Sequence, residues 1–298
     1  MTCFVILHYM AADETIKCVD SILNNVEGEK KIIVVDNFSP NDSYDILLKK
    51  YHDCEFVDVL KTKKNLGFAK GNNFGYYYAV KKYHPEFVTV MNNDMEIFQK
   101  DFIEHIYSSY KQYNYDILGP DVYSTKMEYH QNPQTRKILT LNELKSKYRK
   151  LVIKDRLLFL VCLKWYIKKF LKLDNDEQKE RERKKKIPYV DEVKEQVLIH
   201  GSCYVFSPLF IKKHPKNCFY PKTFMYMEAE ILYYLANKNG EKIIYYPHMK
   251  VYHHEDAATD ATFKSYKKST FSVKCLKQSV KAFIDLMEKD INENKIKP

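Results

Sequence analysis

The chain has few of the residues that mark loop-rich or cross-linked proteins. Its 298 residues include 7 glycines, 10 prolines and 1 tryptophan, which argues against an all-β chain with many tight turns. The 7 cysteines are scattered and form no Cys-x-x-Cys pair. We therefore expect neither a disulfide framework nor a cysteine zinc site, and a reducing cytoplasm is the default compartment.

Long apolar runs are also missing. No stretch of about 18 uncharged apolar residues occurs, so nothing predicts a membrane-spanning helix. The N-terminus lacks a basic segment and a small-residue cleavage site, and the apolar run Cys3–Leu7 is too short for the core of a signal peptide. With 45% apolar and 30% charged residues, the sequence predicts a folded cytoplasmic protein of one large domain or two ordinary ones.

The net charge of +10 is concentrated in one segment. Residues 137–172 carry 11 Lys and Arg side chains against 2 acidic ones. Within it, residues 156–173 place apolar side chains at helical spacing opposite several lysines, which predicts a cationic amphipathic helix. Such a helix could pack on the core or on a partner subunit, or lie on an anionic membrane surface. We expect no nucleic acid, although a nucleic-acid reader is compatible with the charge.

The first 120 residues alternate between strand and helix patterns. Predicted strands cover 3–8, 32–36, 56–60 and 87–91, and a further strand begins at 116; predicted helices cover 13–25, 42–51, 70–83 and 101–112. This alternation predicts a parallel sheet with helices on both faces. Ligands of such sheets bind beyond the carboxyl ends of the strands, so the loops after His8, Asp36, Leu60 and Met91 are where we expect the chemistry.

The pattern changes after residue 120. Residues 121–195 predict a basic insert that is helical over 141–173. Core-like sequence returns at 196–260, with a strand over 197–206, a helix over 228–237, and short strands over 242–246 and 249–253. Residues 261–298 predict a C-terminal tail with one helix or a pair of helices over 265–292.

Four segments together resemble a known family. They are IIVVDNFSPNDS (32–43), NLGFAKGNNFGYYYA (65–79), VMNNDMEI (90–97), and a block from IHGSCYVFSP through FMYMEAEILYYL to VYHHE (199–255). Their order and spacing resemble the family-2 inverting glycosyltransferases of the GT-A fold, especially the rhamnosyltransferase-like bacterial branch. The resemblance covers about 2–120 and 195–260. It implies an α/β, Rossmann-like, mostly parallel sheet with helices on both faces, joined by the helical basic insert and the C-terminal helices.

The resemblance also divides the chain by role. It makes 1–120 the nucleotide-sugar-binding half and 196–260 the acceptor and catalytic half of one GT-A domain. Asp36 would accept a hydrogen bond from the imide N–H of a uracil or thymine ring, although an aspartate here could instead cap the next helix. A helix that begins near Lys70 would direct free N–H groups at the diphosphate. The full set of expected donor-binding residues is His8, Asp36, Asn65, Gly67, Gly71, Asn72, Asn93 and Gly201.

A metal site is implied by Asn92-Asn93-Asp94. The family has a D-x-D-like motif here, whose last aspartate binds a divalent ion, so Asp94 is expected to bind Mn²⁺ or Mg²⁺. The alternative is a polar turn. The matching histidine of the family completes the metal or diphosphate site, which points to His253 and next to His254.

The acidic motif of the family is only partly present. An inverting transfer needs one general base, and Glu228 matches the first acid of the family's motif, with Glu230 in reserve. Ala229 and Ile231 replace the aspartates that usually follow. The alternative is a helix start at which acidic residues favour the helix dipole.

These features together predict a metal-dependent inverting glycosyltransferase of cell-surface polysaccharide synthesis. It would move a hexose or rhamnose from a UDP- or dTDP-linked donor to a saccharide acceptor, free or lipid-linked, and could lie on the inner face of the cell membrane. The first rival is an inactive sugar-nucleotide-binding scaffold subunit at the membrane. The second rival is a sugar nucleotidyltransferase, but this sequence lacks the Gly-rich loop that such enzymes have after the first strand. The sequence leaves open whether the protein forms a homo-oligomer.

Overall fold

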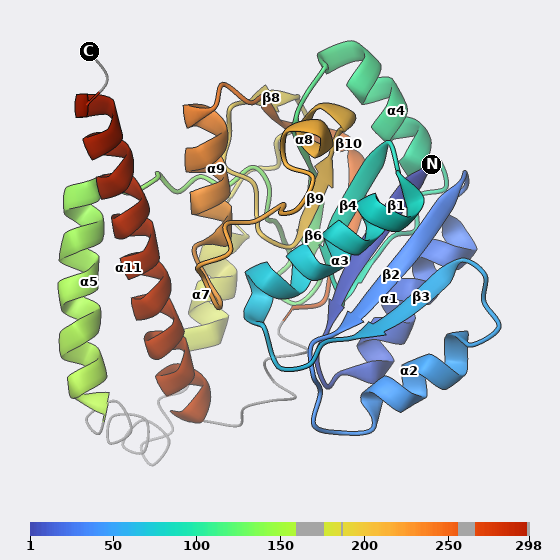
Figure 1. Ribbon diagram of the computed structural model, residues 1–298, viewed down its shortest axis with the longest axis horizontal. Helices are drawn as coiled ribbons and strands as arrows, with labels where there is room; N and C mark the ends of the chain where they lie inside the picture. The colour runs from blue at the N-terminus through green and yellow to red at the C-terminus, as the bar shows by residue number, and fades with distance from the viewer. Residues whose placement is uncertain (159–175, 186, 256–265, 297–298) are drawn as a thin grey trace.

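The computed structural model describes residues 1–158, 176–185, 187–255 and 266–296 (Figure 1). Most of the predicted amphipathic segment, residues 159–173, lies outside this part of the chain. No helix in the described part is both long and apolar enough to cross a bilayer.

The predicted alternation of strands and helices is confirmed in the N-terminal half. In chain order the elements are β1 (Thr2–His8), α1 (Ala12–Asn25), β2 (Lys30–Asp36), α2 (Ser43–Tyr51), β3 (Val57–Lys61), α3 (Gly67–Tyr83), β4 (Phe87–Asn92), β5 (Met95–Glu96), α4 (Phe102–Tyr113) and β6 (Ile117–Ser124). The strands are rich in β-branched residues and buried on both faces, which is why they appear as continuous apolar runs.

The remaining elements complete the sheet and flank it. They are β7 (Tyr129–His130), α5 (Leu141–Arg156), α7 (Asp176–Lys184), β8 (Lys194–Glu195), β9 (Cys203–Phe206), α8 (Pro208–Lys213), α9 (Glu228–Lys238), β10 (Ile243–His253) and α11 (Tyr266–Ile296). Strand order is β3-β2-β1-β4-β9-β6-β10-β5, with β7 beside β6 and β8 beside β10. The long strands run parallel except β9, which lies antiparallel between β4 and β6. The expected mostly parallel GT-A sheet is therefore present.

Each face of the sheet has its own apolar core. Alternate residues of β1 point to opposite faces: Phe4 and Ile6 pack with α1, α2 and α4, whereas Cys3 and Val5 pack with α3, α8 and α9. Helix α3 lies very close to the sheet, because a Cβ atom at Gly75 would stand only 2.5 Å from Val5 Cγ1 and 2.7 Å from Val35 Cγ2.

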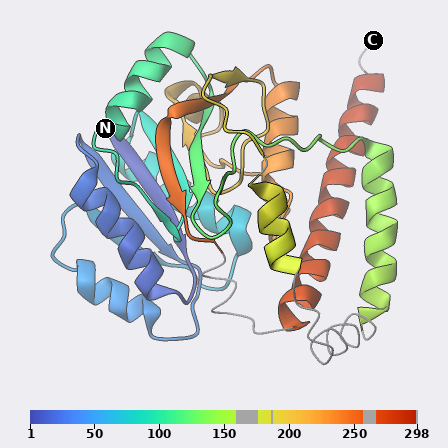
Figure 2. The ribbon, with the colours of Figure 1, turned by 180° about the vertical axis from the view of Figure 1, so that it is seen from behind.

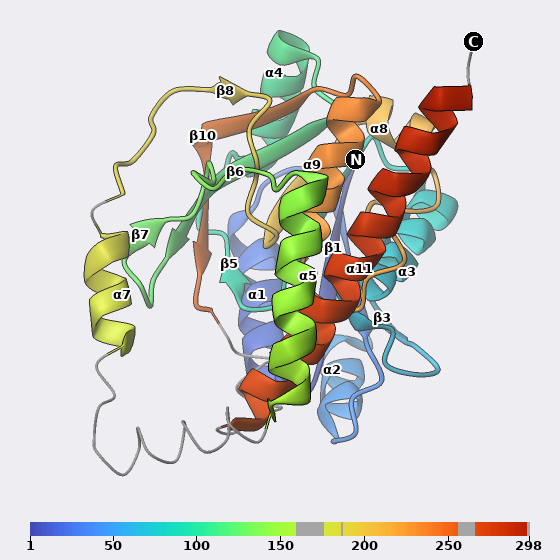
Figure 3. The same ribbon diagram turned by 90° about the vertical axis from the view of Figure 1, so that its left-hand side faces the viewer.

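The insert and the C-terminal tail pack against each other. Helix α5 begins at a capping box, in which Thr140 and Glu143 satisfy each other's backbone N–H groups. Helices α5 and α11 lie side by side at one flank of the molecule (Figures 1 and 3). They share a third apolar cluster with α9, built around Leu144, Phe283 and Ile231. The tail that the sequence left as one helix or two is the single helix α11.

Two strand predictions need correction. Only Cys203–Phe206 of the segment 197–206 is a strand, because the loop before α5 takes the polar groups of the earlier residues: Asn132 Oδ1 accepts from the His200 N–H at 2.6 Å, and Leu198 O accepts from the Gln134 N–H at 2.8 Å. The two short strands predicted over 242–253 form one strand, β10, with an irregularity in pairing between Tyr246 and Lys250.

The close contact at Gly75 generates a test of the packing. Gly75→Ala should destabilise the protein by about 1–2 kcal/mol, because overpacking against two β-branched side chains outweighs the gain in helix propensity. Gly201→Ala is the matched control, since a Cβ there meets nothing within 4 Å. Urea unfolding followed by circular dichroism measures both. A Gly75→Ala protein as stable as the wild type would contradict this account of the α3 contact.

Candidate functional site

The carboxyl ends of the parallel strands meet at one edge of the sheet. His8 at the end of β1 pairs with Asp36 at the end of β2, and Leu7 pairs with Asn92 of β4. His253 ends β10 at the same level as Ser124 of β6. Since β9 runs the other way and Cys203 pairs with Met91, the turn at Gly201 enters at this edge too. The predicted site residues are thereby brought to the place where α/β sheets bind ligands.

Asp36 is fully buried in the turn that follows β2. Both of its carboxylate oxygens lie within 3.3 Å of the backbone N–H of Ser39. This contact fixes the turn, so Asp36 serves the turn itself and does not cap α2, whose N-cap is Asp42. The interaction with a nucleobase stays a prediction.

His8 and Asn93 belong to a buried network beneath this edge. The imidazole of His8 has no exposed surface, and its ring nitrogens lie 2.7 Å from Thr15 Oγ1 and 2.8 Å from Ser43 Oγ. Burial lowers the pKa of His8 to about 4, although nearby Asp36 acts in the opposite direction. Asn93 Nδ2 donates to the same Thr15 Oγ1 at 2.9 Å. Both residues were predicted to bind the donor; in the structure their side chains hydrogen-bond to buried neighbours beneath the site.

Helix α3 begins earlier than the sequence predicted. It starts at Gly67, three residues before Lys70, and its first N–H groups already have acceptors within the protein. Asn37 Oδ1 accepts from Leu66 N–H at 2.8 Å, Asn65 Oδ1 accepts from Gly67 N–H at 2.9 Å, and the carbonyl of Phe224 accepts from the next N–H at 2.6 Å. These three N–H groups therefore have partners within the protein, and the expected contact of the α3 N-terminus with a diphosphate stays a prediction.

The glycines of α3 are explained by packing. Gly67 has a φ of +76°, and a Cβ there would lie 2.3 Å from the carbonyl oxygen of Phe224. A Cβ at Gly71 would lie 2.5 Å from Leu7 Cδ1. The space that these glycines leave is filled by protein, so the structure gives them the role of holding α3 to the sheet and to the Phe224 loop.

The asparagines that follow Gly71 are buried. Asn72 donates from Nδ2 to the carbonyl of Phe68 at 3.0 Å. Asn73, absent from the predicted site set, accepts from the N–H groups of Cys218 and Phe219 at 3.0 and 2.9 Å and donates to the Phe219 carbonyl at 2.8 Å. It ties α3 to the segment that leads into α9. An amide between the apolar positions 69 and 76 on one side of the helix is the signal that could have identified it.

Asp94 and His253 are brought together as predicted. Asp94 Oδ1 lies 3.2 Å from His253 Nε2, and both side chains are over nine-tenths buried. The other ring nitrogen, Nδ1, lies 2.7 Å from Gln131 Oε1. Because an amide oxygen only accepts, Nδ1 carries the proton and Nε2 is turned toward the carboxylate. Sequence analysis did not single out Gln131, which orients this imidazole.

The donor set of this pair fits a divalent cation. A neutral imidazole that donates from Nδ1 presents a lone pair at Nε2, and a carboxylate also presents lone pairs, so the close approach requires a proton or a metal ion. An imidazole nitrogen and a carboxylate oxygen are ligands that Mn²⁺ and Mg²⁺ accept, and here they face each other at 3.2 Å.

His254 points away from this pair. Its ring nitrogens lie 2.9 Å from Thr125 Oγ1 and 3.3 Å from Glu96 Oε1, while its backbone N–H donates to the carbonyl of Asp94. Successive residues of an extended chain face opposite ways, which explains the separation from His253. In the part of the chain that the structure describes, no three His, Cys, Asp or Glu side chains are grouped to hold a metal. The predicted three-residue metal set is thus reduced to two.

The predicted bases, Glu228 and Glu230, differ in their surroundings. The carboxyl of Glu228 is buried and its Oε1 has no hydrogen-bond partner. Burial raises the pKa of Glu228 to about 8; backbone N–H groups and Thr223 oppose the shift, and the charge of Glu230 adds to it. Glu230 instead lies 3.1 Å from Arg136 Nη1. Glu228 is therefore the carboxyl available for proton transfer.

Arg136 and His200 connect the two acidic regions. His200 is hydrogen-bonded through Nδ1 to Ser202 Oγ at 2.8 Å, and its ring centre lies 5.7 Å from that of His253. Burial lowers the pKa of His200 to about 3, and the nearby guanidinium of Arg136 acts in the same direction. Arg136, which sequence reasoning did not select, thus lies near His200 and pairs with Glu230. Gly201 faces open space beside them.

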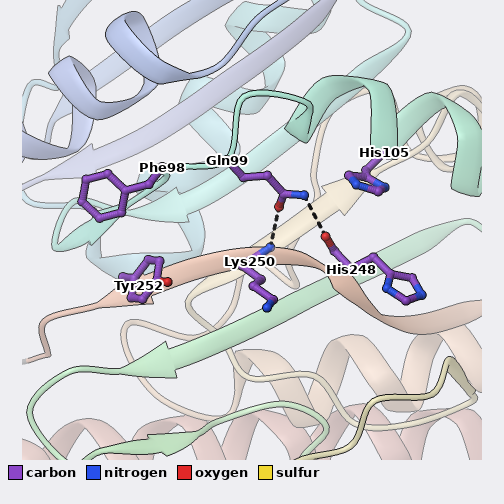
Figure 4. Close-up of a pocket in the computed structure, with 6 residues that line it drawn as sticks. All are labelled: Phe98, Gln99, His105, His248, Lys250 and Tyr252. Carbon is purple, nitrogen blue, oxygen red and sulfur yellow. Dashed lines mark hydrogen bonds between the residues drawn. The ribbon is translucent and has the colours of Figure 1, made fainter.

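A surface pocket lies beyond this group, along β10 (Figure 4). Its lining residues are Phe98, Gln99, His105, His248, Lys250 and Tyr252. Gln99 spans the irregular part of the strand, where Nε2 donates to the His248 carbonyl at 2.9 Å and Oε1 accepts from Lys250 N–H at 3.0 Å. The side chain thereby completes the edge of β10. None of the predicted site residues lines this pocket.

Comparison with solved structures identifies the same fold in glycosyltransferases. S. aureus TarS 1–349 in complex with UDP-GlcNAc matches with a TM-score of 0.54 at 13% identity, over 86% of this chain and 58% of that chain. GalNAc-T7 with UDP, GalNAc and Mn²⁺ matches with a TM-score of 0.54 at 12% identity, over 85% of this chain and 43% of that chain. This chain thus spans less than two thirds of either structure, and at such identities the likeness shows the fold alone.

Comparison of the sequence with curated proteins gives no match. The family model described as "Glycosyl transferase family 2" matches residues 3–172, which is more than half of the chain. That match agrees with the mostly parallel sheet and the polar residues at its carboxyl edge. The chain therefore belongs to glycosyl transferase family 2.

Proposed function

We propose that this protein transfers a sugar from a nucleoside-diphosphate donor to a saccharide acceptor, with inversion at the anomeric carbon. The observation that carries the proposal is the contact of Asp94 Oδ1 with His253 Nε2 at the carboxyl edge of the sheet. The donor nucleotide is UDP or dTDP; the UDP and UDP-GlcNAc complexes of TarS support the first. Asp36 would bind the base, with Asn65 and Asn72 beside the nucleotide.

Asp94 and His253 would hold a divalent cation, Mn²⁺ or Mg²⁺. The Mn²⁺ of the GalNAc-T7 structure supports such use in this fold. The ion, when bound, supplies positive charge that offsets the charge developing on the departing diphosphate. Gln131 keeps the imidazole of His253 turned toward the carboxylate, so its role is to position a ligand.

Glu228 would take the proton of the acceptor hydroxyl. A pKa near 8 suits a general base, because the deprotonated form is populated near neutral pH while its affinity for a proton stays high. Arg136 pairs with Glu230, which leaves Glu228 as the carboxyl without a cationic partner. The hydroxyl then attacks the anomeric carbon opposite the leaving diphosphate, which inverts the configuration.

The transferred sugar would be a hexose or a rhamnose, as in the rhamnosyltransferase-like branch. The acceptor would be a saccharide of cell-surface polysaccharide synthesis, either free or linked to a lipid, at the inner face of the membrane. Residues 156–173, proposed to contact the membrane, lie outside the described residues except for 156–158. The inactive scaffold remains the rival, because Ala229 and Ile231 replace the usual aspartates. The buried carboxyl of Glu228, whose Oε1 has no hydrogen-bond partner among the described residues, favours the enzyme.

Removal of the Asp94 carboxylate should weaken metal-dependent nucleotide binding. In Asp94→Asn, the affinity for UDP in the presence of Mn²⁺ should fall by more than about tenfold, since a ligand to the ion is lost. Isothermal titration calorimetry measures this without turnover. Glu96→Gln is the matched control, because Glu96 pairs with His254 on the other side. Equal UDP affinity in Asp94→Asn and wild type would reject the metal site.

The raised pKa of Glu228 predicts a pH dependence of activity. For consumption of the donor sugar, kcat/KM should rise about tenfold per pH unit below pH 7 and level off above pH 8. Glu228→Gln should lower the rate by about 10²–10⁴-fold and remove this rise. Activity of Glu228→Gln with an unchanged pH profile would exclude Glu228 as the base.

The same pKa shift predicts a pH dependence of stability that holds even for an inactive scaffold. The folded-state pKa of Glu228 lies above its ordinary value of 4.5, so the protonated acid stabilises the fold fully below that value and less as the pH rises toward 8. Glutamine does not ionise. The Tm of Glu228→Gln relative to wild type should therefore increase between about pH 5 and pH 8, which differential scanning calorimetry measures. A constant difference would contradict the burial of this carboxyl.

A further inference from the structure

The outward face of helix α5 carries cations together with exposed aliphatic side chains. The side chain of Ile153 is 58% exposed and that of Leu157 is 39% exposed. The exposed cations on either side of them are Arg149, Lys150, Lys154 and Arg156. Positions three and four apart share one side of a helix, so these residues form a single surface, which we call the α5 face. Figures 1 and 2 show α5 at the outer flank of the molecule, away from the sheet.

The aliphatic side chains of the α5 face are not needed for the apolar core between α5 and α11. The inward side of α5 buries Leu144 and Leu151 against α11 and α9. Ile153 and Leu157 lie on the opposite side and belong to no apolar cluster of the described residues. Exposure of two such side chains one turn apart is unfavourable in water unless another surface covers them.

The cations of the α5 face differ from several other cations of α5 and α11, which have acidic partners. Lys145 pairs with Glu288 at 2.6 Å, Lys277 pairs with Asp155, and Lys281 pairs with Asp285. No carboxylate of the described residues lies within ion-pair distance of the four cations on the α5 face. The six residues of the α5 face therefore carry four positive charges and no negative one, and they complement a negatively charged partner.

We propose that the α5 face docks on an anionic lipid bilayer. Ile153 and Leu157 would enter the boundary between headgroups and acyl chains, while the four cations lie over the lipid phosphates. A nucleic acid or another polyanion would also attract the cations, but it offers nothing to cover two aliphatic side chains. The mixture of charge and exposed apolar surface is what favours the bilayer.

This inference deepens the proposed function and rests on it for its purpose. An enzyme that glycosylates a lipid-linked acceptor needs its edge of strand ends held near the membrane. The docking surface itself is independent of the chemistry at Asp94 and of residues 159–173. Docking can therefore be tested by an experiment that does not measure sugar transfer.

Vesicle flotation of the full chain tests the α5 face. The vesicles contain equal parts of phosphatidylcholine and phosphatidylglycerol, and a second set contains phosphatidylcholine alone. The wild type should float with the anionic vesicles and not with the neutral ones. Lys150→Gln with Lys154→Gln should lower the partition coefficient about thirtyfold, and Ile153→Ser with Leu157→Ser at least about tenfold.

The matched control removes two exposed aliphatic side chains from another helix. Ile46 and Leu48 of α2 are 41% and 40% exposed, so Ile46→Ser with Leu48→Ser should leave flotation unchanged. Thermal melts of all three double variants check that each one folds. A loss of flotation in the α2 variant equal to that in the α5 variants would overturn the assignment to this face.

Other outcomes also overturn the proposal. If the wild type does not float, no bilayer is bound. If the Ile153→Ser with Leu157→Ser variant floats like the wild type, the two aliphatic side chains make no contact with the bilayer. Retention of this variant and of the wild type on a heparin column would then identify a site for polyanions. Titration of the wild type with UDP and Mn²⁺ in parallel reports on the strand-end site. Loss of docking with UDP binding intact rejects the α5 face alone.

Discussion

The candidate site depends on one buried contact, that of Asp94 with His253. The two residues are far apart in the sequence and come from the turn after β4 and the end of β10. They meet because β4 and β10 run in the same direction, so that their carboxyl ends reach the same edge of the sheet. A carboxylate in this buried place requires a compensating positive group, which a bound cation would provide while the neutral imidazole supplies a second ligand. The direction of the strands is thus the physical basis of the proposed chemistry.

A second set of contacts brings the C-terminal half to that edge. The first turn of α3 approaches the carbonyl of Phe224 so closely that only glycine fits at position 67. Asn73 holds the backbone at 218–219 with three hydrogen bonds. The chain then passes through left-handed residues at Tyr226 and Met227 and enters α9 at Glu228. Helix α3 thereby holds the segment that leads to the candidate base, through the N–H of Phe68 and the side chain of Asn73.

The flank of the molecule contributes in a different way. Helices α5 and α11 come from the insert and the tail, but they pack as a pair whose apolar cluster includes Ile231 of α9. The helix that presents Glu228 therefore packs against the sheet on one side and against the pair of α5 and α11 on the other. Any surface bound by the outer side of α5 is thereby linked through a packed layer to the helix that carries Glu228.

The sequence by itself determined the local elements and the positions of the polar residues between them. Runs such as Ile32–Asp36 are buried strands in any topology, and Asp94 follows a strand whatever its neighbours are. Periodicity and spacing are local properties, so they also located the loops of the site. They could not show where each side chain points. The side chains of His8 and Asn93 turn into the protein, and that of His254 turns away from His253, because strand pairing and helix packing decide those directions.

Only the tertiary structure decided the partners. Only there is it visible that β9 runs antiparallel between β4 and β6, and that the two short strands predicted over 242–253 form the single strand β10. The same holds for the packing of α5 on α11 and for the positions of Gln131 and Arg136. Each of these contacts joins segments distant in the chain, and its free energy comes from burial and hydrogen bonding that no local pattern records. Residue types show what chemistry is available, whereas the packing of distant segments decides which of those residues meet.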